Sequence, residues 1–177
     1  YHIDHGYFNR GHYDGFYRVT KNNTQHVVRT LETWSEDRFR RLGLDVKAWR
    51  KQGKCVIIVP PTRTFAQFAG IDVETWTTLA KNRVKAVTDR PVVICTKADK
   101  TLHTLLADAW CLVTYNSNAA VDALLAGVPV VVDGPSCARP VAWSYDDIET
   151  PWWPEDRQRW ANMLAYQQFT VEEMKSG

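Results

Sequence analysis

The sequence predicts an α/β protein with a Rossmann-like parallel sheet that carries helices on both faces. Two observations lead to this fold class. Short apolar runs alternate with helical patterns between residues 54 and 134, and the runs are continuous rather than alternating, as in strands buried on both faces. A small α/β portion is expected before this region and a helical tail after it, so the chain is divided into residues 1–50, 51–150 and 151–177.

Four apolar runs are the predicted strands of the sheet. KCVIIVPP (residues 54–61) is ended by two prolines, which is typical of a buried strand that stops abruptly. RPVVICTK (90–97), WCLVTY (110–115) and VPVVVDG (128–134) follow in order. Their alternation with helical segments gives the order βαβαβαβ, which favours a parallel sheet.

Three helices are predicted between these strands. Residues 101–109 form a short helix, and residues 117–127 form a helix that Gly127 closes. Residues 73–89 have helical periodicity. Their apolar face consists of Val73, Trp76, Leu79, Ala80, Val84 and Val87.

The two flanking portions combine short strands and helices. Residues 1–8 and 15–20 read as two strands joined by a loop, and residues 35–42 and 46–52 read as short helices. At the other end, residues 155–168 have an amphipathic helical pattern. A last helix follows, in which Thr170 and Glu173 fit a capping box.

Composition excludes several broad classes of protein. The net charge of +2, from 22 basic and 20 acidic residues, is too balanced to indicate a nucleic-acid binder by itself. No apolar run approaches the ~20 residues of a membrane span. Because the chain begins with Tyr1 rather than Met, we expect it to be a piece or a processed form of something longer.

The four cysteines are predicted to be reduced thiols in the core of a cytoplasmic protein. They are Cys55, Cys95, Cys111 and Cys137, and most of them lie in or beside predicted strands. They form no CxxC pair, and no His spacing typical of a metal site is present, so no metal is expected.

The loops that follow the four predicted strands carry hydroxyl, amide or charged side chains. They are residues 61–64, 97–100, 115–118 and 133–136. Parallel sheets bind ligands beyond the carboxyl ends of their strands, so this edge is the expected site for a polar ligand, although surface loops are polar in general. The candidate binding residues are Thr62, Arg63, Lys97, Asn116, Ser117, Asn118 and Ser136.

The turn YNSNAA (residues 115–120) allows two interpretations. Asn116 or Ser117 can cap the following helix by accepting a bond from a free backbone N–H group. Alternatively the helix start, with its small residues, admits a phosphate. Neither a GxGxxG fingerprint nor a P-loop is present, and Lys97 is either a phosphate contact or a solvated lysine.

The N-terminal segment offers candidate bases. Asp4 and His5 lie at the end of the first predicted strand, where a carboxylate or an imidazole can act as a general base. The alternative is that they form a local hydrogen-bonded turn.

These motifs, taken in order, resemble GT-B glycosyltransferases of the capsule polysaccharide biosynthesis family and related phage proteins. LVTYNSNAAVDALLAGVPVVV (residues 112–132) is similar to the donor-site segment of that group. Residues 42–62 and 88–97 are similar to the entry and second strand of its C-terminal domain, and residues 148–177 are similar to its closing segment. IDHGYFNR and GFYRVT resemble the end of the preceding domain.

The resemblance implies a nucleotide-sugar donor as substrate, with no covalently bound cofactor and no metal. It places the donor phosphate on the Ser117 turn, puts the Thr62 loop and Lys97 at the cleft, and makes Asp4 or His5 the base that activates a hydroxyl acceptor. The expected reaction is sugar transfer to a glycan in a bacterial cytoplasm, that of the host cell if the protein is phage-encoded. A homodimer is compatible with this picture.

Two alternatives remain open at the level of sequence. The acceptor can be a modified base in DNA, an interpretation that rests on the basic residues Arg10, Arg18, Lys21 and Arg29. Alternatively the chain is a non-catalytic module that binds a nucleotide, a sugar or a host component. This second alternative rests on the short N-terminal portion, since only about 50 residues precede the first strand of the sheet.

Overall fold

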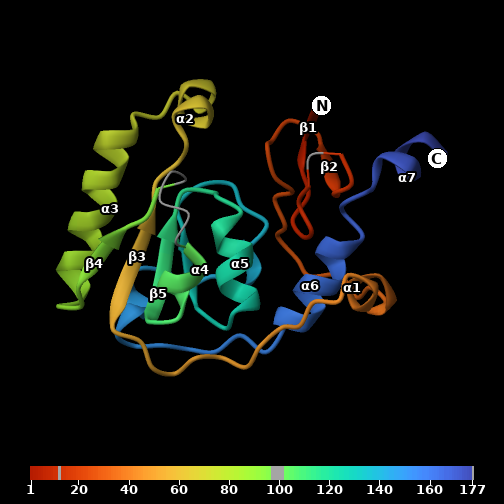
Figure 1. The fold of residues 1–177 in the computed structure, drawn as a ribbon. Coiled ribbons are helices and arrows are strands. Elements are labelled where there is room, and N and C mark those ends of the chain that lie inside the picture. Colours follow the sequence, from red (N-terminus) through yellow and green to blue (C-terminus); the bar gives the residue numbers. More distant parts are fainter. Residues whose placement is uncertain (12, 97–101, 177) are drawn as a thin grey trace. The chain divides into compact units, whose positions relative to one another are not determined.

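A computed structural model describes residues 1–11, 13–96 and 102–176 (Figure 1). The chain divides into two compact units, which are named here unit 1 and unit 2. Unit 1 consists of Tyr1–Val46, Pro135–Val141 and Pro154–Gly177, and unit 2 consists of Lys47–Gly134 and Ala142–Trp153. The N-terminal and C-terminal segments therefore belong to the same unit.

Unit 2 is built on a four-stranded parallel sheet, which confirms the predicted fold class. Its strands are β3 (Cys55–Val59), β4 (Val92–Ile94), β5 (Ala109–Thr114) and β6 (Val130–Val132). They are arranged in the order β4-β3-β5-β6. Every residue of β3, β5 and β6 is buried, as expected when helices cover both faces.

Four helices connect these strands. They are α2 (Arg63–Ala69) and α3 (Val73–Val87) after β3, α4 (Leu102–Leu106) after β4, and α5 (Ala119–Leu125) after β5. In Figure 1, α3 lies on one side of the sheet and α5 on the other. The helix α2 was not predicted from the sequence, where residues 61–64 were interpreted as a loop.

The apolar face of α3 is narrower than predicted. Trp76, Ala80 and Val84 are buried against the sheet, with Val56 among their neighbours. The side chain of Leu79, in contrast, is 56% exposed. At about 100° per residue, Leu79 points roughly 100° away from the centre of the buried stripe, so it lies outside the face that contacts the sheet.

The predicted helix at residues 46–52 is wrong, because this segment is not helical. Its amides bond to carbonyls at the end of α5 instead: Lys47 N–H donates to Leu125 (2.9 Å) and Arg50 N–H donates to Gly127 (2.8 Å). Gly127 has a φ of +79°, and a Cβ there would overlap with the carbonyl oxygen of Ala48. Tertiary hydrogen bonds thus replace the local bonds of a helix.

In its described residues, unit 1 contains a two-stranded antiparallel sheet and three α-helices. The strands β1 (His2–His5) and β2 (Tyr17–Thr20) form the sheet, as predicted. The helices are α1 (Asp37–Arg41), α6 (Arg157–Ala165) and α7 (Val171–Ser176). A short 3-10 helix, η2 (Arg139–Val141), completes unit 1, and η3 (Asp146–Ile148) belongs to unit 2.

The C-terminal segment is tied to the rest of unit 1 by backbone and side-chain bonds. Tyr17 and Phe169 exchange two backbone hydrogen bonds (2.8 and 2.7 Å), and Trp160 Nε1 donates to the carbonyl of Cys137 (2.9 Å). The capping box of α7 is confirmed: Glu173 N–H donates to Thr170 Oγ1 (3.1 Å), and Thr170 N–H donates to the Glu173 carboxylate (2.7 Å).

All four cysteines are free and buried, which confirms their prediction as reduced core thiols. Burial raises the pKa of Cys111, and it raises that of Cys137 to about 12. Both are therefore neutral thiols without the reactivity of a thiolate. Within the described ranges, no helix is both long and apolar enough to cross a membrane.

Candidate functional site

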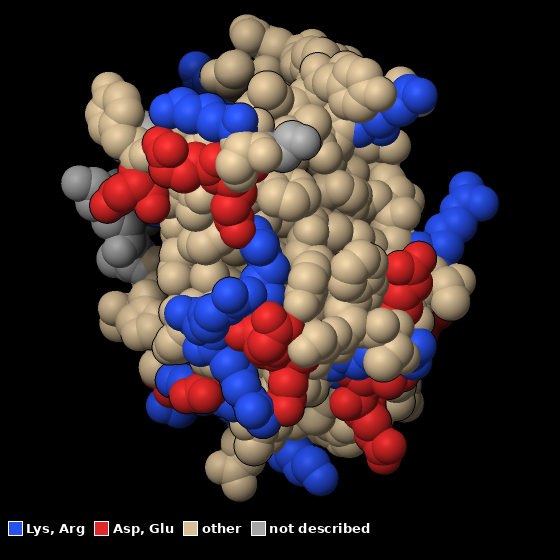
Figure 2. Space-filling model, turned by 90° about the vertical axis from the view of Figure 1, so that its right-hand side faces the viewer, with Lys and Arg blue, Asp and Glu red and all other residues tan. Residues whose placement is uncertain are grey.

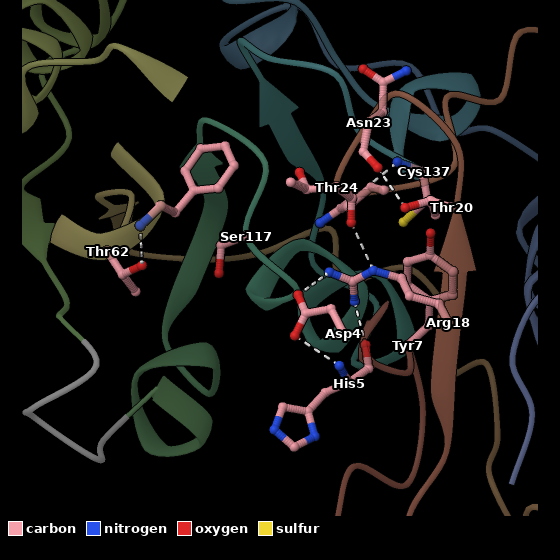
Figure 3. A network of polar contacts seen from close by, with 12 residues as sticks. Asp4, His5, Tyr7, Arg18, Thr20, Asn23, Thr24, Thr62, Ser117 and Cys137 are labelled. Atoms are coloured by element: carbon pink, nitrogen blue, oxygen red, sulfur yellow. Dashed lines mark hydrogen bonds and ion pairs between the residues drawn. The ribbon is translucent and has the colours of Figure 1, made fainter. Parts of the chain in front are cut away.

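The sheet of unit 2 has one topological switch point, which lies between β3 and β5. The chain leaves β3 for β4 on one side and then crosses to β5 on the other side. In open parallel sheets, ligands bind outside the carboxyl ends of the strands at such a point. The loops that follow β3 and β5 carry Thr62 and Ser117, so the fold brings these two predicted residues to the same edge (Figure 3).

Thr62 is the N-cap residue of α2. Its backbone is extended, and its Oγ1 accepts a hydrogen bond from the N–H of Phe65 (3.3 Å). A threonine hydroxyl that accepts one bond still has its own O–H to donate. Arg63 is the first residue of the helix and is exposed. This loop therefore presents one O–H donor and one guanidinium.

The Ser117 turn is capped by Ser117 itself. Ser117 Oγ accepts from the N–H of Ala119 (3.2 Å), whereas Asn118, at the N-cap position of α5, makes no capping bond with its side chain. Asn116 is buried. Ser117, one of the two caps that the sequence allows, thus caps the turn, and its O–H remains as a donor.

A short chain of hydrogen bonds links the end of β3 to the Ser117 turn. Ser117 N–H donates to Thr114 Oγ1 (3.4 Å), and the Thr114 hydroxyl donates to the carbonyl of Val59 (2.8 Å). Thr114 is fully buried at the end of β5. This contact holds the ends of the two central strands, and with them the start of the Ser117 turn, in one arrangement.

Aromatic rings surround the same edge of the sheet. The Tyr115 ring lies 6.0 Å from Phe65 of α2 and 6.4 Å from Trp76 of α3, measured between centroids. Gly134, in the loop after β6, donates its N–H to the Tyr115 carbonyl (2.8 Å). A Cβ at Gly134 would overlap with the Tyr115 ring, so glycine is what allows this close packing.

Asp133 is a further polar residue of this edge and is not among the candidate residues that the sequence predicts. One carboxylate oxygen accepts from Trp76 Nε1 and from the Tyr145 hydroxyl, both at 3.0 Å, and the other lies 3.5 Å from Arg83. Burial, together with the charge of Asp133, raises the pKa of Tyr145. Trp76, Arg83 and Tyr145 are distant in sequence, so only the fold reveals this cluster.

Two further predicted binding residues do not join the group at the switch point. Ser136 belongs to unit 1, where it is buried and its hydroxyl is bonded to Gln25 (3.3 Å) and to the N–H of Ala138 (3.2 Å). Lys97 lies outside the described residues.

The two candidate bases lie at the end of β1 in unit 1. Asp4 pairs with Arg18 of β2 in the sheet register, and its carboxylate bonds to the guanidinium at 2.6 Å and to the N–H of His5 at 2.7 Å (Figure 3). The carboxylate remains 52% exposed. The His5 ring is stacked on Tyr17 at 5.8 Å. Asp4 thus lies in a paired strand rather than in a local hydrogen-bonded turn, and its side chain is about half exposed.

The basic residues proposed for DNA contact differ in accessibility. Arg18 is only 3% exposed and is paired with Asp4, so it is not a surface contact for phosphates. Arg10, Lys21 and Arg29 are exposed. On the face shown in Figure 2, basic and acidic side chains are interspersed, without a wide area of one sign. On this face there is thus no basic patch that would favour a DNA acceptor.

The described residues contain no group of three or more His, Cys, Asp or Glu side chains that could hold a metal ion. No protein-family model, no curated protein and no solved structure matches this chain.

Proposed function

We propose that the protein is a glycosyltransferase-like enzyme that moves a sugar from a nucleotide-sugar donor to a hydroxyl acceptor. The observation that supports this proposal is the pairing of the Thr62 and Ser117 loops at the switch point of a parallel sheet. The proposal assigns a glycan as the acceptor and the cytoplasm as the location, where reduced cysteines are stable.

The chemistry of the two loops suits a phosphate group. The hydroxyls of Thr62 and Ser117 each accept one bond from a backbone amide, which orients the oxygen and leaves the O–H free to donate. The exposed Arg63 adds a positive charge beside them. Donors of this kind bind the phosphates of the donor and stabilise the negative charge that develops on the departing nucleoside diphosphate.

In the proposed reaction a base takes the proton of the acceptor hydroxyl, a role for which Asp4 is the candidate. The acceptor oxygen forms a bond to the anomeric carbon as the bond from that carbon to the phosphate oxygen breaks, and the nucleoside diphosphate leaves with both electrons. General-base catalysis of this kind contributes about 10²–10⁴-fold.

Calorimetric titration with UDP-glucose, GDP-mannose and the corresponding nucleosides tests the proposal. Both nucleotide-sugars carry phosphates that the nucleosides lack, so we expect at least one of them to bind and the nucleosides not to bind. Ser117→Ala is expected to weaken that binding about tenfold or more, since hydrogen bonds to charged groups are worth about 1.5–3 kcal/mol.

Loss of the cap is separated from loss of a ligand contact by a matched control. Asp72 caps α3 through the N–H of Thr75 (2.7 Å), so Asp72→Ala removes a cap that lies outside the Thr62 and Ser117 loops. The proposal requires Ser117→Ala to weaken binding and Asp72→Ala to leave it unchanged. If both variants lose stability but keep their affinity for the nucleotide-sugar, the turn is only a cap. The expected loss of stability for Ser117→Ala is then about 0.5–2 kcal/mol.

The second candidate function is a module that binds nucleotides or sugars without catalysis. Binding without release of nucleoside diphosphate, in the presence of water and of simple sugars as acceptors, would favour it over the enzyme.

A further inference from the structure

We propose that Arg18 is a positioning residue, which holds the Asp4 carboxylate in one orientation so that Asp4 can act as the base on the acceptor hydroxyl. This inference rests on the proposed function for the role of Asp4 as a base. The holding of Asp4 by Arg18 can be tested independently.

The guanidinium of Arg18 is fixed on all three of its nitrogen atoms. Nε donates to the carbonyl of Thr24 (2.9 Å), Nη1 to the carbonyl of His5 (2.5 Å) and Nη2 to the carboxylate of Asp4 (2.6 Å), as the dashed lines in Figure 3 show. The group also lies over the Tyr7 ring, 5.2 Å from its centroid. Because the planar guanidinium has a fixed fork geometry, these contacts together define a single orientation of the group.

Burial makes this arrangement stiffer than an ordinary surface ion pair. The side chain of Arg18 is 4% exposed, whereas that of Asp4 is 52% exposed. Exposed pairs are weakened by solvent and by the entropy of two mobile side chains, but here one partner is held inside unit 1. Release of Asp4 would leave a buried guanidinium without its counter-ion, which is unfavourable.

A second hydrogen bond defines the rotation of the carboxylate. Asp4 Oδ1 accepts from the N–H of His5 (2.7 Å), while Oδ2 accepts from Arg18. The same guanidinium bonds to the His5 carbonyl, so Arg18 also fixes the peptide that supports Asp4. Each carboxylate oxygen retains a lone pair, and half of the group faces solvent, where a hydroxyl can approach.

The first test is a double-mutant cycle on kcat, with whichever of UDP-glucose and GDP-mannose binds as the donor and water as the acceptor. Asp4→Asn is expected to lower kcat at least 100-fold. Arg18→Met is expected to lower kcat at least tenfold in the wild-type background but less than twofold in the Asp4→Asn background, with KM for the donor unchanged. Additive effects of the two substitutions would overturn the inference.

Arg38 provides a matched control for loss of a partly buried arginine in unit 1. It bonds to the carbonyls of Ala165 and Gln168 (2.7 Å each) and to Glu173, in contacts that do not include Asp4. Arg38→Met is expected to lower stability while kcat stays within twofold. An equal loss of kcat in both arginine variants would show that only folding is affected.

The second test does not require a donor. Hydrogen exchange of the His5 amide, which bonds to Asp4, is expected to accelerate at least tenfold in Arg18→Met and to stay unchanged in Arg38→Met. If Arg18→Met does not fold, Arg18→Lys replaces it, since lysine keeps the charge but loses the fork.

The outcomes separate the inference from the proposed function. If hydrogen exchange of the His5 amide is unchanged in Arg18→Met, Arg18 does not hold Asp4 in place, whatever the enzymatic activity of the variant. Accelerated exchange in a protein that turns over no donor would refute the enzymatic function, and the base role of Asp4 with it. Accelerated exchange together with a non-additive loss of kcat would support both.

Discussion

At the scale of single residues, His26 is a partly buried titratable group that is bonded to Tyr7. The Tyr7 hydroxyl forms a hydrogen bond with its Nδ1 (2.9 Å) and accepts from its backbone N–H (2.8 Å). Burial, and to a smaller extent the charge of Arg18, lowers the pKa of His26. Burial also holds the pKa of Tyr7 well above its usual value, with Cys137 as a second cause, so the native pair is neutral.

This pair predicts a loss of stability as the pH falls. Below the unfolded pKa of about 6.5, the unfolded chain binds a proton that native His26 resists, so the free energy of unfolding decreases with falling pH. In the native protein that proton would place a cation in a partly buried position beside Arg18. Urea unfolding at pH 7 and pH 5 measures the effect.

His26→Asn is the control, because the asparagine amide oxygen can accept from Tyr7 without titrating. The variant is expected to lose less stability than the wild type between pH 7 and pH 5. Equal losses in the two proteins would show that groups other than His26 cause the pH dependence.

At the scale of elements, Gly127 connects the end of α5 to the extended segment at residues 47–50. Gly127→Ala is expected to destabilise the protein by about 2–4 kcal/mol, since it combines a positive φ with an overlap on the Ala48 carbonyl. Gly70 has a φ of +66°, and a Cβ added there would have no atom within 4 Å. A Gly70→Ala substitution therefore measures the effect of backbone strain without a steric overlap.

Gly70→Ala should therefore cost only about 1 kcal/mol. Chemical denaturation of both variants gives the comparison. A similar cost for the two substitutions would mean that residues 47–50 can move away from α5 without loss, contrary to the role assigned to their hydrogen bonds.

The elements also show what local sequence can and cannot predict. Strands β3, β5 and β6 are continuous apolar runs, and that pattern identifies them without knowledge of their neighbours. The helix predicted at residues 46–52 is absent because its amides find partners more than 70 residues away in α5. Periodicity carries no information about such distant hydrogen bonds.

The residues of the candidate site also differ in whether the local sequence can predict them. The positions of Thr62 and Ser117 after strands could be predicted, because the strands follow from the local pattern, and so could the cap at Ser117. The cap at Thr62 could not, since the sequence does not predict α2. Asp133 and its partners could not, since Trp76 and Tyr145 approach it only in the folded sheet. The burial of Arg18 beneath Asp4 likewise depends on pairing between β1 and β2.

At the scale of the whole molecule, unit 2 depends on a segment that is separated from it in the chain. Ala142–Trp153 supplies Trp143, which pairs with Val131, and Ile148, whose carbonyl accepts from Trp110 Nε1 (2.6 Å). Trp110, Trp143 and Trp153 have ring centroids 5.5–6.3 Å apart. The core on this face of the sheet is incomplete without that segment.

A fragment of residues 47–153 is therefore expected to show the near-ultraviolet circular dichroism of packed tryptophans and cooperative thermal unfolding. A fragment of residues 47–134, which lacks the segment, is expected to show neither. Cooperative unfolding of the shorter fragment would mean that the sheet and its helices form a sufficient core by themselves.

The pairing of Tyr17 with Phe169 has a consequence for synthesis of the chain. Residues 47–153 leave the ribosome, and can fold, before Phe169, which forms a bridge with Tyr17 of β2, emerges. The small sheet of β1 and β2, in contrast, lacks its partner along the free edge of β2 until α6 and residue 169 have been synthesised. Unit 2 is thus expected to fold first during translation, and the Asp4 end of β1 is completed last.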